Sequence, residues 1–252
     1  MRLDQFLVSN NYFESRNKAQ NEIASGNVLV NDKVITKGSF DVTEADNIKI
    51  VDSCPYVSRG GFKLEGALKS FNISLNDKVV LDIGSSTGGF TDCSLQNGAK
   101  LVYAVDVGSN QLHKSLLSNP KVISLEQTNI LDLEPSDLKI KPEVLVMDVS
   151  FVSIEYLLPG IIKFIDNDTI FISLIKPQFE VGNMKFKNGV IKDKSIHINV
   201  IQNVRKELNK YNLDIFKLIP SPIKGGSGNK EFLVLIKNGF NPDLNIIKSI
   251  EE

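Results

Sequence analysis

The sequence predicts an α/β protein in which a mainly parallel, doubly wound sheet of seven strands follows a smaller α/β domain. From residue 59 to residue 252, short apolar stretches alternate with amphipathic helical patterns, which is typical of parallel sheets covered by helices. Residues 1–51 instead carry two helical patterns and then a hairpin pattern. Between these parts, residues 52–58 contain a proline and show little periodicity, which indicates a linker.

The first 51 residues predict two helices that pack on a small sheet. Ser15 suits the N-cap of the second helix because its hydroxyl can accept a free backbone N–H. The predicted elements are a first helix with Leu3, Phe6 and Leu7 on one face, a second helix with Ala19 and Ile23 on one face that stops at Gly26, a hairpin over residues 28–35 and a strand over Ile48–Val51.

The remainder of the chain predicts the large sheet. A first helix carries Leu64, Leu68 and Phe71 on one face, and a long helix later carries Ile196 to Leu208 in the same way. The predicted strands cover residues 79–81, 101–105, 122–125, 144–147, 170–175, 213–219 and 232–236. Sheets of this kind bind their ligands at the carboxyl ends of the strands, so functional residues are expected there.

Composition excludes several classes of protein. Hydrophobic residues make up 42% of the chain and charged residues 23%, which is ordinary for a folded protein. No run of 18 apolar residues occurs, and the first residues lack the apolar stretch of a signal peptide. Cys54 and Cys93 cannot form a disulfide framework, and with two scattered histidines they do not predict a zinc site. We therefore expect a cytoplasmic protein without a membrane span or a metal.

Charge alone does not indicate a nucleic-acid-binding protein. The whole chain has a net charge of −1, and residues 1–57 carry six Lys or Arg (2, 16, 18, 33, 37, 49) against eight Asp or Glu (4, 14, 22, 32, 41, 44, 46, 52), which gives −2. Any affinity for RNA must come from the local placement of cations, because phosphate contacts depend on position.

Residues 79–90, Val-Val-Leu-Asp-Ile-Gly-Ser-Ser-Thr-Gly-Gly-Phe, predict a ligand-binding turn between a strand and a helix. Small residues let the backbone approach a ligand, and the helix start presents free N–H groups. A dinucleotide fingerprint needs glycine where this chain has Ser86, and the Gly-Lys-Ser/Thr of a P-loop is missing. A methionine carboxylate with an adenosine fits this turn better than a pyrophosphate.

Two later strand ends continue the pattern. Asp106 ends the second strand of the sheet, where a carboxylate can accept both ribose hydroxyls. Asn129 and Ile130 follow the third strand and could hold an adenine by polar and apolar contact. Each residue also has a structural interpretation, with Gly84 as a turn glycine and Asp106 as a helix cap. The ordered set of all three features favours a nucleoside ligand.

Six stretches of the chain resemble the successive motifs of TlyA-type (hemolysin-like) ribosomal RNA methyltransferases, relatives of the FtsJ/RrmJ group. In chain order they are VSRGGFKL, LDIGSSTGGFTD, VYAVDVG, MDVSF, LIKPQFE and SPIKGGSGNKEFLVL. The resemblance spans nearly the whole chain. It implies a Rossmann-like S-adenosylmethionine-dependent methyltransferase fold in residues 59–252. The two helices and the tight hairpin of residues 1–51, with Arg2, Arg16 and Lys18 at the helix starts, resemble the αL RNA-binding domain of the ribosomal-protein-S-four type.

The resemblance also implies a reaction and its residues. The reaction is methyl transfer from S-adenosylmethionine to the ribose 2′-hydroxyl of a cytidine in 23S ribosomal RNA, with 16S RNA open as a second target. The implied catalytic tetrad is Lys63, Asp148, Lys176 and Glu231. Lys176 would take the proton or only stabilise the oxyanion, and both assignments stay open. Without the resemblance, Lys63 could be a solvated charge and Glu231 a charged residue guarding a strand edge.

Two sets of binding residues complete the expectation. The expected cofactor contacts are Asp82, Gly84, Ser85, Ser86, Thr87, Gly88, Gly89, Phe90, Asp106, Val107, Asn129, Ile130 and Asp148. The expected RNA contacts are Arg2, Ser15, Arg16 and Lys18, at the helix starts, where the alternative is a structural cap with solvated charges. We expect ribosomal RNA or a ribosomal subunit as partner, with no membrane and no obligate protein partner. The competing classes are a membrane-active haemolysin, an RNA chaperone and a nucleotide-linked oxidoreductase.

Overall fold

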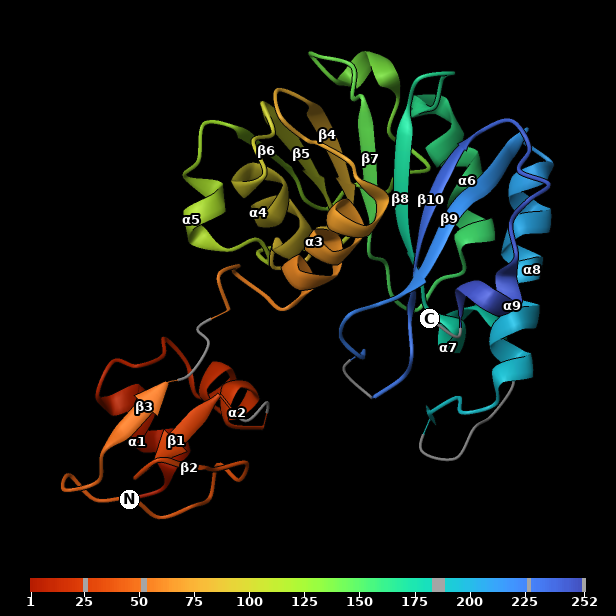
Figure 1. The fold of residues 1–252 in the computed structure, drawn as a ribbon. Helices are drawn as coiled ribbons and strands as arrows, with labels where there is room; N and C mark the ends of the chain where they lie inside the picture. The colour runs from red at the N-terminus through yellow and green to blue at the C-terminus, as the bar shows by residue number, and fades with distance from the viewer. Residues whose placement is uncertain (25–26, 51–53, 183–188, 226–227, 251–252) are drawn as a thin grey trace. The chain divides into compact units, whose positions relative to one another are not determined.

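A computed structural model of the chain describes residues 1–24, 27–50, 54–182, 189–225 and 228–250. The chain divides into two compact units, Met1–Pro55 and Tyr56–Glu252 (Figure 1). The division falls inside the stretch 52–58 that the sequence predicts as a linker, of which residues 52 and 53 lie outside the described residues. Tyr56 is buried in the second unit, with its ring edge-on to that of Phe62.

The first unit packs two helices on a three-stranded antiparallel sheet. Its elements are α1 (Leu3–Ser9), α2 (Arg16–Ala24), β1 (Val28–Val30), β2 (Lys33–Val34) and β3 (Ile48–Ile50), with strand order β2-β1-β3. The core includes the predicted Leu3, Leu7 and Ile23, all fully buried. Asn31 and Asp32 form the hairpin turn with positive φ angles of 51° and 64°, which suit a two-residue hairpin loop. Gly26 and Val51 lie outside the described residues.

The second unit contains a seven-stranded, mainly parallel sheet, which confirms the predicted fold class. Its strands, in the order β6-β5-β4-β7-β8-β10-β9, are β6 (Val122–Leu125), β5 (Leu101–Val105), β4 (Val79–Ile83), β7 (Val144–Met147), β8 (Ile170–Ile175), β10 (Phe232–Asn238) and β9 (Leu213–Pro220). The five strands from β6 to β8 are parallel, whereas β10 runs antiparallel to both β8 and β9.

Helices cover both faces of this sheet. Figure 1 shows α3 (Gly60–Phe71) and α4 (Gly89–Gln96) on one face, with α6 (Ile154–Ile161) and α8 (Lys194–Asn209) on the other. One-turn helices are α5 (Lys114–Leu117), α7 (Pro177–Glu180) and α9 (Ile246–Ser249), and two 3₁₀ turns cover Pro135–Asp137 and Ile162–Phe164. Within the described residues, no helix is both long and apolar enough to cross a membrane.

The strand order places the expected site at one edge of the sheet. The strand order reverses direction between β4 and β7, and sheets of this kind bind their ligands at the carboxyl ends of the strands beside such a reversal. Because β10 is antiparallel to β8, Phe232 at its start pairs with Ile175 at the end of β8. Residues just before β10 therefore reach the same edge as residues that follow the parallel strands.

Candidate active site

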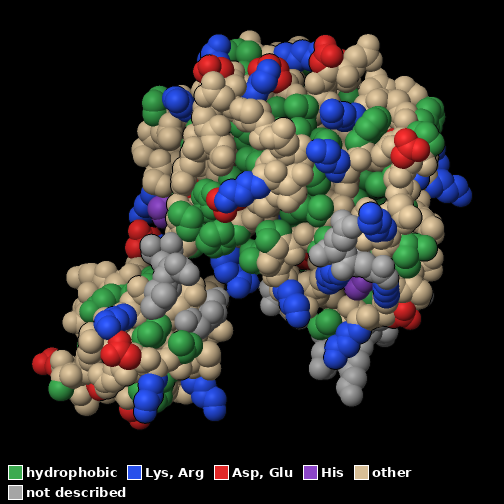
Figure 2. Space-filling view, in the orientation of Figure 1, with side chains coloured by type: hydrophobic (Ala, Val, Ile, Leu, Met, Phe, Trp, Pro, Cys, Tyr) green, Lys and Arg blue, Asp and Glu red, His purple; other side chains and the backbone are tan. Residues whose placement is uncertain are grey.

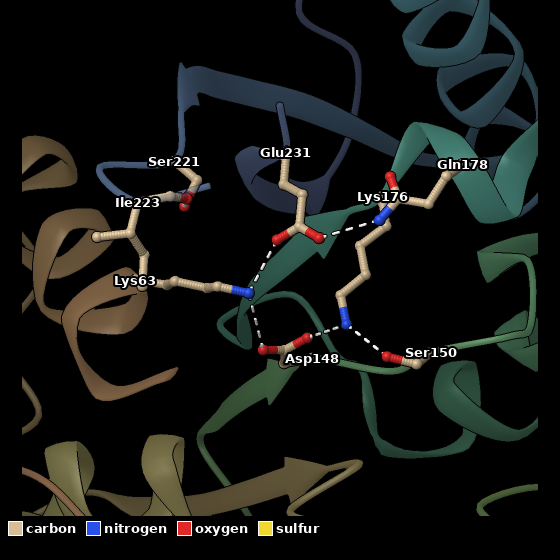
Figure 3. Close-up of polar contacts among 8 residues, drawn as sticks. All are labelled: Lys63, Asp148, Ser150, Lys176, Gln178, Ser221, Ile223 and Glu231. Carbon is tan, nitrogen blue, oxygen red and sulfur yellow. Dashed lines mark hydrogen bonds and ion pairs between the residues drawn. The ribbon is translucent and has the colours of Figure 1, made fainter. Parts of the chain in front are cut away.

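The four residues of the implied tetrad converge at the carboxyl edge of the sheet (Figure 3). Lys63 comes from α3, and its Nζ lies 2.8 Å from Glu231 Oε2 and 3.5 Å from Asp148 Oδ2. Lys176 follows β8, and its Nζ lies 2.6 Å from Asp148 Oδ1. Asp148 therefore lies between the two amines, and Lys63 lies between the two acids.

Burial distinguishes this cluster from ordinary surface charges. The exposed fractions are 8% for Lys63, 9% for Lys176 and 3% for Glu231. An ionised group removed from water costs several kcal/mol unless charges and hydrogen bonds compensate it, and here each charge contacts an opposite one. This geometry excludes Lys63 as a solvated charge and Glu231 as an exposed edge residue.

Three further residues support the tetrad, and the sequence analysis did not single them out. Lys176 Nζ donates to Ser150 Oγ at 2.7 Å, and Gln178 Nε2 donates to Glu231 Oε1 at 3.1 Å. A Cβ on Gly225 would collide with the Glu231 carboxylate, so a larger residue there would displace that carboxylate. Their only signal was their position inside the quoted motifs, because no local pattern reveals these contacts.

The predicted ligand turn joins β4 to α4. Gly84 has a φ of 81°, and a Cβ there would lie 2.8 Å from Val149 Cγ1 and 3.0 Å from the Asp148 carbonyl oxygen. Gly88 also has a positive φ, of 97°, and is buried. Ser86 adopts a positive φ of 47° although it carries a side chain, and Ser86 and Thr87 are exposed. The turn therefore presents small residues and backbone beside Asp148.

Asp106 is fixed at the same edge as this turn. Its Oδ2 accepts the Ser86 N–H at 2.8 Å, and its Oδ1 accepts the Gly108 N–H at 2.7 Å. A carboxylate has about four acceptor sites, so two remain for ribose hydroxyls. The nearest following helix, α5, is capped by His113, which excludes Asp106 as its N-cap. Val107 is 71% exposed and offers an apolar surface next to the acid.

The other expected cofactor residues take different positions. Asp82 is fully buried, its Oδ2 accepts the Thr91 hydroxyl at 2.6 Å, and burial raises its pKa to about 7. Ile130 is 3% exposed and belongs to the core of the unit. Asn129 uses its Oδ1 to accept the Leu131 N–H at 3.1 Å. Ser85, Gly89 and Phe90 are buried in the turn and the start of α4. Asp82 therefore ties the end of β4 to α4, and Ile130 packs in the core.

An exposed aromatic ring lies beside the tetrad. Phe151 is 90% exposed and has a φ of 65°, which is uncommon for a residue with a bulky side chain. Its ring packs on that of Phe179 at a centroid distance of 4.9 Å. Lys176 Nζ lies 5.9 Å from the centroid of Phe179. Strained residues of this kind cluster at functional sites, so Phe151 joins the candidate site.

Two of the expected RNA-binding residues of the first unit, Arg2 and Arg16, contact a buried acid that the sequence analysis missed. Arg2 donates to both carboxylate oxygens of Asp4, at 3.0 and 3.1 Å, and Arg16 Nε donates to Asp4 Oδ2 at 3.0 Å. These bonds hold the pKa of Asp4, which is fully buried, well below its usual value. Ser15 Oγ accepts the Lys18 N–H at 3.3 Å, as expected of an N-cap. Both arginine side chains stay more than 40% exposed.

The part of the chain that the structure describes contains no group of three or more His, Cys, Asp or Glu side chains arranged to hold a metal ion. The paired amines and acids lie together at the carboxyl edge of the sheet. A cluster of this composition can exchange a proton with a hydroxyl and stabilise the oxyanion that forms.

Comparison with known proteins matches both units. The FtsJ-like methyltransferase family model matches residues 56–238, and the S4 domain model matches residues 1–48. Hemolysin A of Brachyspira hyodysenteriae is 43% identical, covering 92% of this chain and 98% of that protein. The 23S rRNA (cytidine-2′-O)-methyltransferase TlyA of Campylobacter jejuni is 38% identical, covering 94% and 100%. The 16S/23S rRNA (cytidine-2′-O)-methyltransferase TlyA of Mycobacterium tuberculosis is 34% identical, covering 94% and 89%.

Solved structures agree with these matches. A protein from Streptococcus thermophilus that is named as a hemolysin superposes with a TM-score of 0.79 at 38% identity, covering 100% of this chain and 94% of the other. The fold is shared, over 73% of this chain, with a protein from Listeria monocytogenes that is named as an S-adenosylmethionine-dependent methyltransferase. That protein is 17% identical, and the TM-score is 0.53. The resemblance read from the motifs is confirmed: the chain belongs to the FtsJ-like methyltransferase family, with an S4 domain ahead of the methyltransferase unit.

Proposed function

We propose that this protein transfers a methyl group from S-adenosylmethionine to the ribose 2′-hydroxyl of a cytidine in ribosomal RNA, with 23S RNA as the target and 16S RNA left open as a second one. The observation that carries the proposal is the cluster of Lys63, Asp148, Lys176 and Glu231 beside the turn at residues 84–89. Relatives named as rRNA (cytidine-2′-O)-methyltransferases support the same reaction.

The turn and the neighbouring strand ends fit the methyl donor. Gly84 and Gly88 let the turn pack closely against its protein neighbours, and the exposed Ser86 and Thr87 are the part of the turn that a methionine moiety could contact. The two open acceptor sites of Asp106 suit a ribose diol. Val107 and Asn129 would border the adenine. S-adenosylmethionine bound there supplies a sulfonium methyl group to the attacking ribose oxygen. Asp148, whose backbone touches the turn, would lie at the reacting centre.

The tetrad supplies the proton transfer that the reaction requires. A ribose hydroxyl is a weak acid, so its proton must be removed or its developing charge stabilised. Lys63 contacts two carboxylates, whereas Lys176 contacts one carboxylate and the Ser150 hydroxyl. Fewer ion pairs break when Lys176 becomes neutral. We therefore assign proton removal to Lys176 and a permanent positive charge to Lys63, with Asp148 orienting Lys176 and Glu231 orienting Lys63.

Several surface features suit an RNA substrate. Figure 2 shows Lys and Arg side chains along the lower edge of the larger unit. Exposed Lys192 and Lys224 lie on segments that border the tetrad's edge of the sheet, where they could contact phosphates. Phe151 could stack on the base of the target nucleotide, since protein aromatic rings bind unstacked bases in this way. In the first unit, Arg2 and Arg16 would contact phosphates. We infer a cytoplasmic enzyme that meets its RNA in a ribosomal subunit, without an obligate protein partner.

Transfer of labelled methyl groups tests the proposal. The purified protein is incubated with S-adenosylmethionine carrying a tritiated methyl group and with unmodified large or small ribosomal subunits, and the modified position is mapped. Lys176→Ala should lower the single-turnover rate by about 10²–10⁴-fold. Lys78→Ala is the matched control, because Lys78 also pairs with one acid, Glu143, but at the opposite edge of the sheet. No labelling by the wild-type protein refutes the proposal, and full activity of Lys176→Ala refutes the assignment of the base.

The pH dependence separates the two assignments of Lys176. If Lys176 removes the proton, the single-turnover rate should rise with pH until the amine is neutral. If it only stabilises the oxyanion, the rate should fall when the amine loses its charge. A rate that falls across alkaline pH would therefore overturn proton removal by Lys176 and leave the methyltransferase function standing.

A further inference from the structure

Glu126, directly after β6, binds three consecutive backbone amides of a neighbouring loop. Its Oε2 accepts the Asn110 N–H at 2.9 Å, and its Oε1 accepts the N–H groups of Gln111 at 2.8 Å and Leu112 at 3.1 Å. Asn110 has a positive φ of 55°, so the loop is held in an unusual backbone conformation. One carboxylate thus fixes the segment that follows Asp106 and leads into α5.

This segment is in direct contact with the ligand turn. His113 donates its backbone N–H to the Thr87 carbonyl oxygen at 3.2 Å. A Cβ on Gly88 would lie 2.9 Å from Leu112 Cδ1 and would collide with Leu116. Residues 112 and 116 therefore form the wall against which the turn is packed. If residues 110–112 moved, the turn would lose both this wall and a hydrogen bond.

The same segment also contacts the expected ribose-binding acid. The Gly108 N–H donates to Asp106 Oδ1 at 2.7 Å, and the Gly108 carbonyl oxygen accepts the Gln127 N–H at 2.9 Å. Glu126 and its neighbour Gln127 therefore bind the loop at two places, at residues 110–112 and at Gly108. Through this loop, the end of β6 is linked to the end of β5 and to the turn after β4.

The carboxylate of Glu126 is suited to this task because it is charged. Its three backbone hydrogen bonds hold the pKa of Glu126 below its usual value, so it remains ionised at neutral pH. Hydrogen bonds to an ionised acceptor are about twice as strong as those between neutral groups. A neutral amide at this position would keep one acceptor oxygen and would turn an NH₂ group toward an N–H group that needs an acceptor.

We propose that Glu126 is a positioning residue of the cofactor site, which holds residues 110–113 so that the turn at residues 84–89 and Asp106 are in place before the methyl donor binds. This role rests on the proposed function. Glu126 touches none of the tetrad residues in the contacts that the structure describes, so it acts on cofactor affinity and not on the chemical step.

Glu126→Gln provides the test. If the loop leaves its binding-competent arrangement nine tenths of the time, the apparent dissociation constant rises about ten-fold. We expect a rise of about ten-fold or more in the Kd for S-adenosylmethionine by calorimetry, and a matching rise in its KM. The kcat at saturating S-adenosylmethionine should stay within about two-fold of wild type.

Glu143→Gln is the matched control. Glu143 is also a partly exposed acid that accepts a backbone N–H, from Val79 at 3.2 Å, but it lies at the opposite edge of the sheet. It should lower stability without changing the Kd for S-adenosylmethionine. A purely structural role for Glu126 predicts that the two variants behave alike, and an unchanged Kd in Glu126→Gln would overturn the inference.

A measurement on the wild-type protein makes the test independent of variant folding. Hydrogen exchange should show that S-adenosylmethionine slows exchange at residues 110–113 and at residues 85–89 together, and protection confined to the turn would overturn the coupling. Absence of any binding by the wild-type protein would overturn the proposed function itself. Binding by the wild type with an unchanged Kd in Glu126→Gln overturns only the role of Glu126.

Discussion

Replacing Lys63 with methionine tests whether the buried charges of the tetrad depend on one another. The change keeps most of the side-chain volume but removes the ammonium group that lies 2.8 Å from Glu231 Oε2. Glu231 is 3% exposed, and its remaining side-chain partner among the described residues is the neutral Gln178. Removing one partner of a buried ion pair costs about 3–5 kcal/mol, because the other charge stays buried without compensation.

This cost is large enough to measure in two ways. For a unit of this size, about 1 kcal/mol shifts Tm by roughly 2–4 °C, so Lys63→Met should lower Tm by about 6–20 °C. Losing a cation next to a developing oxyanion should lower the single-turnover rate by about 10²–10³-fold. Thermal unfolding and transfer of tritiated methyl groups at saturating S-adenosylmethionine would give the two quantities separately.

The double variant Lys63→Met/Glu231→Leu separates stability from catalysis. Replacing a buried ion pair with apolar residues of similar volume is often neutral, so the double variant should regain most of the lost stability. Its rate should stay as low as that of the single variant, because the ammonium group is still missing. A single variant as stable as wild type, or a double variant with nearly wild-type activity, would refute the reasoning.

The remaining predictions concern three other residues. Phe151→Ala should raise the KM for ribosomal RNA by roughly 5–150-fold, which corresponds to about 1–3 kcal/mol of lost stacking. The Kd for S-adenosylmethionine should not change, and an equal effect on both ligands would argue against stacking. Asp82 keeps its proton up to about pH 7 in the folded protein but loses it near pH 4 when unfolded. The wild type should therefore lose stability relative to Asp82→Asn as pH rises from 5 to 8. A difference between the urea midpoints of the two proteins that stays constant over this pH range would contradict the prediction. Asp4→Asn should destabilise the first unit by about 2 kcal/mol or more, measured by hydrogen exchange, and should weaken RNA binding, because the arginines lose their charged acceptor; unchanged exchange would exclude this role.

The sequence predicted the large sheet well because each strand has a local signature. Buried strands such as β4 and β7 are uninterrupted apolar runs, and their carboxyl ends had to meet at one edge once the sheet was parallel. That argument alone placed Asp148 and Lys176 near the ligand turn. Lys63 and Glu231 lie outside the strands, and only the resemblance of their motifs pointed to them. The one-turn helices α5, α7 and α9 are too short for a periodic pattern, so they were not predicted.

The supporting contacts could not be predicted, because they join residues that are distant in the chain and have no local signature. Gln178 reaches Glu231 across 53 residues, and Glu126 reaches back 16 residues to Asn110. Each of these residues is an ordinary polar residue in the sequence. Ile130 shows the converse case, because an apolar residue after a strand suits both an adenine and the core, and the structure buries it in the core. Whether such a residue lies in the core or faces a ligand depends on packing across the whole unit.

In the first unit, the count of charged residues did not predict which charges lie at the surface. In the net charge, Asp4 offsets one positive charge. In the structure, however, Asp4 is buried beneath Arg2 and Arg16, which remain partly exposed. At contact distance, a phosphate would meet the guanidinium groups first, because Coulomb energy falls with distance and the acid lies behind them. Beyond a Debye length of about 8 Å, salt screens these charges, and residues 1–57 carry a net charge of −2, so the unit gives little long-range attraction. RNA recognition by this unit would therefore rest on the fixed orientation of two arginines, and Asp4 would be the residue that provides it.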